Sequence, residues 1–89
     1  MMSKYEVLQV RRMLAEQELV EKVSIRINEL NMLYIQNMDS IEKTAQRIED
    51  YELLTSALWD AYSHEIDVLK QMCIQHGVSK SNMFKLFVA

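Results

Sequence analysis

The sequence predicts an all-α fold, and three observations carry the prediction. The chain has 89 residues, of which 49% are apolar, with one glycine and no proline. Because glycine and proline form the turns of β-rich folds, many short strands are difficult to build from this composition. Apolar residues instead recur three, four or seven positions apart, which is the spacing of one face of an α-helix. We therefore expect a single helical domain over residues 1–89.

The first predicted helix covers residues 4–36. Its apolar stripe consists of Val10, Met13, Val20, Val23, Ile27, Leu30 and Tyr34. Near its end the side chains of Met32, Leu33 and Ile35 extend the apolar surface around the helix, so this part needs neighbours on more than one side.

A turn is predicted at residues 37–40, where Asn-Met-Asp-Ser interrupts the apolar pattern. Asp39 can accept hydrogen bonds from the free amides of a new first turn, and Glu42 can reach back from three residues on, as in a capping box. Because no glycine or proline forces a turn there, one continuous helix up to His76 is the alternative.

The second predicted helix covers residues 40–76. Its apolar stripe consists of Ile41, Ala45, Ile48, Tyr51, Leu54, Leu58, Tyr62, Ile66, Leu69 and Cys73. Gly77 predicts the end of this helix, because the residue after a helix C-terminus often adopts the left-handed conformation that glycine tolerates best. Ser79 can then cap a last short helix over residues 79–88.

A two-helix hairpin of this length leaves apolar residues uncovered. Leu53, Val68 and Ile74 lie outside the stripe of the second helix, and Trp59 borders it. We expect two hairpins to pair as a dimeric four-helix bundle. An extended coiled coil ranks second, because the apolar residues exceed the two in seven that a strict seam requires. The predicted partner-binding residues are Leu53, Trp59, Val68, Ile74, Phe84 and Phe87.

These features favour a small non-enzymatic protein–protein interaction module. We expect an adaptor, a chaperone-like bundle or an inhibitory accessory protein, roles that very small helical proteins of bacteria and their viruses often have. The expected partners are a second copy of the chain, forming a homodimer, and another protein.

The alternative is a DNA-binding protein that uses a C-terminal unit over residues 69–87. The stretch LKQMCIQHGVSKSNMFKL resembles the core of a helix-turn-helix motif, because the small Cys73 lies four residues before Gly77 and apolar residues follow at helical spacing. The side chains that would contact phosphates or bases are Ser79, Lys80, Asn82 and Lys85. The net charge of −3 gives no general attraction to nucleic acid.

Local charge is uneven along the chain. Arg11 and Arg12 adjoin on the first helix, with Lys4 nearby, and such a cluster can bind phosphate or an acidic protein surface. Residues 49–67 are rich in acids, so the acidic surface can be that of another copy.

No catalytic residue, metal site or cofactor is predicted. Asp60, His64 and Asp67 share a helix face, but this face is polar and has no second histidine. Cys73 and His76 lie three residues apart without an evident orienting acid, and a single glycine cannot form a phosphate-binding loop.

We expect a cytoplasmic location without a membrane span. The single cysteine cannot form an intramolecular disulfide, and the sequence shows no secretory leader pattern. Charged residues interrupt every apolar run before it reaches the roughly eighteen residues that a spanning helix requires.

Overall fold

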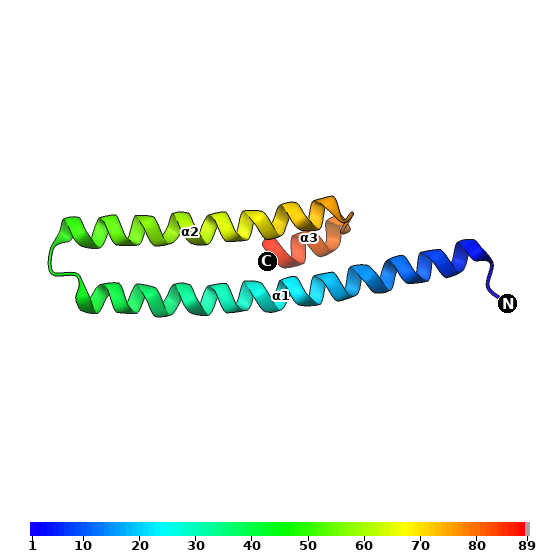
Figure 1. Cartoon of the computed structure of the whole chain (residues 1–89), viewed down its shortest axis with the longest axis horizontal. Helices are drawn as coiled ribbons and strands as arrows, with labels where there is room; N and C mark the ends of the chain where they lie inside the picture. Colours follow the sequence, from blue (N-terminus) through cyan, green and yellow to red (C-terminus); the bar gives the residue numbers. More distant parts are fainter. Residues whose placement is uncertain (89) are drawn as a thin grey trace.

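The computed structural model describes residues 1–88, so that Ala89, the last residue of the predicted domain, lies outside the described residues. These residues form three helices, α1 (Lys4–Thr44), α2 (Ile48–Gln75) and α3 (Lys80–Phe87). α1 and α2 run side by side in opposite directions, and α3 folds back between their ends (Figure 1). The described residues contain no strand, which confirms the all-α prediction. Among residues 1–88, no helix combines the length and the apolar character needed to cross a membrane.

The predicted turn at residues 37–40 is wrong, because α1 continues through it to Thr44. Asp39 does not cap a new helix but forms an ion pair at 2.9 Å with Lys43, one turn further along α1. The Thr44 hydroxyl donates a hydrogen bond at 2.8 Å to the carbonyl of Ser40, again within the same helix. The ion pair and the hydrogen bond both join residues four apart in one helix, so they favour a continuous helix. The predicted capping box does not form.

The turn lies instead at residues 45–47, so a single continuous helix is also excluded. Ala45 leaves the helix with extended backbone angles, and its N–H donates to the Ile41 carbonyl at 2.9 Å. Arg47 precedes α2 with an extended φ of −122° and makes no side-chain capping hydrogen bond. Neither residue is a usual turn former, so the sequence carries no local signal for this turn.

The predicted end of the second helix at Gly77 is confirmed. Gly77 adopts a φ of 71°, and the N–H of Val78 donates to the carbonyl of Cys73 at 3.1 Å. Ser79 then caps α3, because its hydroxyl accepts from the backbone N–H of Asn82 at 3.3 Å.

The buried core lies where the three helices meet. Val23 of α1, Cys73 of α2 and Val78 of the connection to α3 are 1%, 0% and 9% exposed. Half-buried apolar side chains surround this cluster, namely Leu19, Val20, Ile27, Leu69, Met72, Met83, Leu86 and Phe87. The core therefore fastens α3 to the hairpin at the end away from the turn.

The molecule is a rod of 68 × 17 × 16 Å with a radius of gyration of 18.5 Å. A compact domain of this length has a radius of gyration of about 12 Å. The N-terminal part of α1 extends beyond the end of α2 and the start of α3 (Figure 1). We call residues 4–12 the overhang. At its inner end, Arg12 borders a small cavity together with His76 and Gly77.

Candidate interaction surfaces

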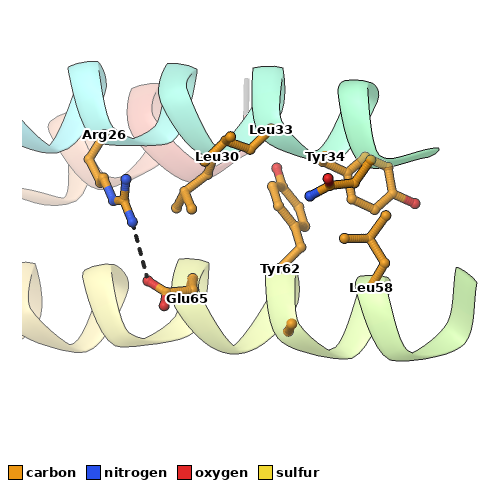
Figure 2. A pocket seen from close by; sticks show the side chains of 9 residues that line it. Arg26, Leu30, Leu33, Tyr34, Leu58, Tyr62 and Glu65 are labelled. Carbon is orange, nitrogen blue, oxygen red and sulfur yellow. Dashed lines mark ion pairs between the residues drawn. The ribbon is translucent and has the colours of Figure 1, made fainter. Parts of the chain in front are cut away.

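A shallow groove of about 250 Å³ runs between α1 and α2 near the middle of the hairpin. Figure 2 shows the side chains that line it, contributed by both helices. The lining residues are Arg26, Leu30, Leu33, Tyr34, Asn37, Leu58, Ala61, Tyr62 and Glu65. Apolar side chains form most of the walls, and polar groups lie toward the ends, an arrangement suited to an apolar side chain of a partner.

An aromatic cluster fixes the register between the two long helices beside this groove. The ring of Tyr34 in α1 lies 5.0 Å from that of Tyr62 and 6.0 Å, edge to face, from that of Trp59, both in α2. The Tyr62 hydroxyl donates a hydrogen bond to the side-chain oxygen of Asn31. Trp59 is 55% exposed despite these contacts, so much of its indole is available to a partner.

Arg26 forms the charged end of the groove. Its guanidinium forms an ion pair with Glu29 at 3.1 Å within α1 and approaches Glu65 of α2 at 4.0 Å (Figure 2). All three side chains are about half exposed, so each pair contributes at most about 1 kcal/mol. These pairs orient the rim of the groove more than they stabilise the fold.

Five of the six predicted partner-binding residues have exposed side chains. At roughly 100° per residue, the four predicted residues of α2 point at intervals of about 60° around the helix, in the order Trp59, Ile74, Leu53 and Val68. They spread over about half of the circumference of α2, and Phe84 lies on α3. The predicted residues therefore form a broad apolar face and not one compact patch.

Phe87, the sixth predicted residue, is half-buried. Its ring packs against the buried cluster of Val23, Cys73 and Val78. α3 turns this side chain toward the hairpin, while Phe84 points outward and is 59% exposed. Phe87 therefore holds α3 in place, and its role in partner binding is limited to its exposed edge.

The sequence did not single out the exposed apolar side chains at the two ends of the rod. In the overhang these are Tyr5, Leu8 and Val10, and beside the turn they are Ile48, Tyr51 and Leu54. Val10, Ile48, Tyr51 and Leu54 belong to predicted apolar stripes. The N-terminal part of α1 extends past α2, so the stripe of the overhang has no helix opposite it (Figure 1). The sequence did not reveal this overhang, because the turn was predicted at residues 37–40 and not at residues 45–47.

An acid of α1 already binds two of the four predicted nucleic-acid contact residues. The Glu16 carboxylate accepts hydrogen bonds from the Ser79 backbone N–H at 2.5 Å and from the Asn82 side-chain amide at 3.2 Å. These hydrogen bonds, the first above all, lower the pKa of Glu16 below its ordinary value. Lys80 and Lys85 are exposed. A carboxylate thus lies at the N-terminus of α3, where a phosphate would otherwise bind, and repels it.

The other chemistry-bearing residues form no cluster. Within residues 1–88, no three His, Cys, Asp or Glu side chains come together in a way that could hold a metal ion, and this includes Asp60, His64 and Asp67. Cys73 is fully buried, and burial raises the pKa of its thiol. A buried neutral thiol acts as a small apolar packing group.

Comparisons of this chain with protein families, with curated proteins and with solved structures find no match.

Proposed function

We propose that this chain is a small non-enzymatic interaction module that works as a dimeric helical bundle and binds a second protein. The observation that carries this proposal is the amount of apolar surface left uncovered. Leu53, Trp59 and Ile74 on α2, and Ile25 and Met32 on α1, are each more than half exposed. Ile25 and Met32 line one hollow together with Leu33, and adjoining exposed apolar side chains of this kind are characteristic of protein–protein contacts.

The total exposed area supports the same proposal. The chain exposes 7352 Å². A compact monomer of 10.5 kDa exposes about 5,400 Å² by the usual scaling of area with mass. The excess is about 1,900 Å², and a standard stable interface covers about 800 Å² on each partner. The rod therefore has room both for a second copy and for another protein.

The surfaces suit an adaptor, a chaperone-like bundle or an inhibitory accessory protein. Such roles need an apolar surface that another protein can cover, and the groove at Leu33, Leu58 and Ala61 provides one beside the exposed Trp59. Tryptophan at the centre of an interface frequently contributes more binding energy than other residues. We also propose a cytoplasmic location, in keeping with a single cysteine that is buried and free.

Two measurements test this proposal. Light scattering after size exclusion at micromolar concentration should give the mass of a dimer, and a folded monomer would contradict the proposal. The double variants Leu53→Ser/Val68→Ser and Trp59→Ser/Ile74→Ser each alter one half of the apolar face of α2. One pair should abolish dimerisation or partner capture while the circular dichroism spectrum stays helical. If both variants keep every association of the unmodified chain, these surfaces are not binding sites.

A further inference from the structure

We infer that the two copies of the dimer run antiparallel, with the overhang of each copy packed against the turn end of the other. We call residues 39–54 the turn end. The inference rests on the proposed self-association. It adds the relative orientation of the two copies and the segments through which they contact each other. A second copy of this chain is the occupant of both surfaces.

The apolar face of the overhang has no packing partner in its own chain. Its residues lie beyond the ends of α2 and α3, and Tyr5 and Leu8 are 69% and 53% exposed. Ser3 caps its first turn by accepting a hydrogen bond from the Glu6 N–H at 3.2 Å, so the helix is well started. The overhang continues a helix that is already formed, but its end frays without tertiary contacts, and packing of its apolar face against a second copy stabilises it.

The turn end offers an apolar surface of matching character. Ile48 and Leu53 are 75% and 69% exposed there. A hollow of about 290 Å³ lies beside the turn, lined by Thr44, Ala45, Gln46, Asp50, Leu53 and Leu54. Apolar side chains of a second copy's overhang can fill this hollow and cover these residues.

The two ends of the rod carry opposite charge. The overhang has Lys4, Arg11 and Arg12 against Glu6, three positive charges and one negative, which leaves +2. The turn end has five acids and two bases, which leaves −3. The acids are Asp39, Glu42, Glu49, Asp50 and Glu52, and the bases are Lys43 and Arg47.

These charges decide the orientation. An antiparallel pair places each basic overhang beside an acidic turn end, twice per dimer through the two-fold axis. A parallel pair places overhang beside overhang and turn end beside turn end, so that like charges meet at both ends. Complementary charge selects between orientations more strongly than it adds affinity.

Charge-swapped variants of the full chain test the orientation. Lys4→Glu/Arg11→Glu makes the overhang acidic, and Glu42→Lys/Glu52→Lys makes the turn end basic while keeping the acids of the first turn of α2. In low salt, each variant alone should dissociate about tenfold more readily than the unmodified dimer. An equimolar mixture should form a heterodimer with close to the original affinity, because both of its contacts then join opposite charges.

A matched control and a second readout complete the experiment. Lys22→Glu/Lys70→Glu alters two exposed lysines away from both ends, makes the same change in net charge as the overhang variant, and should leave the dimer unchanged. In the unmodified protein, a carbodiimide should cross-link Lys4 to acids of the turn end, and mass spectrometry should assign these links to dimers. The two segments lie at opposite ends of a 68 Å rod, so a link within one chain is impossible.

The outcomes separate this inference from the proposed function. If the protein is a dimer but the mixture does not restore affinity, or the cross-links join overhang to overhang, the antiparallel arrangement is wrong and the interaction module stands. If the unmodified chain is a folded monomer, both proposals fail.

Discussion

The carboxylate of Glu16 in α1 accepts a hydrogen bond at 2.5 Å from the backbone N–H of Ser79, 63 residues further along the chain. Ser79 is the residue before α3, and its N–H would otherwise lack a partner at this helix start. The same carboxylate accepts from the side chain of Asn82 at 3.2 Å. One acid of α1 therefore joins the start of α3 to the hairpin.

Glu16→Gln should lower stability at neutral pH and have little effect in acid. The hydrogen bond from Ser79 holds the pKa of Glu16 below its ordinary value of 4.5, so the ionised form stabilises the fold. This contribution is fully present above pH 4.5 and is lost as the pH falls through the lower folded-state pKa. Urea unfolding at pH 7 and at pH 3 measures the change.

The control is Glu18→Gln, which alters an exposed acid two residues away, about 160° around α1. The difference in unfolding free energy between Glu18→Gln and the unmodified chain should not become smaller at pH 3, because Glu18 does not take part in the hydrogen bond to Ser79. If Glu16→Gln is as stable as the unmodified chain at pH 7, the hydrogen bond to Ser79 does not stabilise the fold.

Gly77→Ala should destabilise the fold by about 1 kcal/mol, because an L-residue is strained at the left-handed φ of 71°. No atom lies within 4 Å of the position of an added Cβ, so the cost is conformational and not steric. Asn tolerates this conformation better, so Gly77→Asn should cost less than Gly77→Ala. If the unmodified chain, Gly77→Ala and Gly77→Asn have the same unfolding midpoint at one protein concentration, the backbone at residue 77 can change its conformation without cost.

Cys73→Ser should destabilise the fold by about 1–3 kcal/mol, because it places a hydroxyl in an apolar site where the native side chain is 0% exposed. Cys73→Ala is the matched variant, since it removes the thiol without adding a polar group. Denaturant unfolding should rank the serine variant below the alanine variant. The reverse ranking would mean that water or a polar group reaches this site.

The same thiol predicts a loss of stability in alkali. Burial raises the pKa of Cys73 above its ordinary value of 9.0, so the fold favours the neutral thiol. Its contribution is present below pH 9.0 and is lost as the pH rises through the higher folded-state pKa. Unfolding midpoints of the unmodified chain should therefore fall more steeply above pH 9.0 than those of Cys73→Ala.

DNA retention tests the alternative function, and we expect none. Glu16 occupies the N-terminus of α3, and the chain carries a net charge of −3. Electrophoretic mobility at low salt should show no shift of duplex DNA. If a salt-sensitive shift appears and the triple variant Lys80→Ala/Asn82→Ala/Lys85→Ala abolishes it while the dimer persists, the chain is a DNA-binding protein.

Local signals in the sequence were sufficient for the C-terminal part of the fold. Gly77 ends α2 and Ser79 caps α3, and each acts through its own backbone conformation or hydroxyl group. The turn between the long helices was misplaced because Asp39 has a capping pattern but a better partner in Lys43. The observed position of the turn is consistent with the contact between Tyr34 of α1 and Tyr62 of α2, which sets how the two helices align. A contact between residues so far apart in the sequence leaves no local pattern.

The candidate surfaces were predictable only in part. Leu53, Val68 and Ile74 fall outside the apolar stripe of α2, Trp59 borders it, and the side chains of all four are exposed. Phe87 has the same apolar character, but its position on the short α3 turns it toward the core, which spacing over eight residues cannot reveal. The contact between Glu16 and Ser79 joins segments far apart in the sequence, so only the folded chain shows it.

The short connection at residues 45–47 also orders the events of folding. Contacts beside this connection close the smallest loops and should form first, and contacts between segments further apart should follow. The hydrogen bonds that Glu16 accepts from Ser79 and Asn82 join segments 63 and 66 residues apart and should form among the last. Residues 4–12 lie beyond even that contact. If they pack against a second copy as inferred above, their amide hydrogens should exchange on the timescale of subunit dissociation and not on that of unfolding.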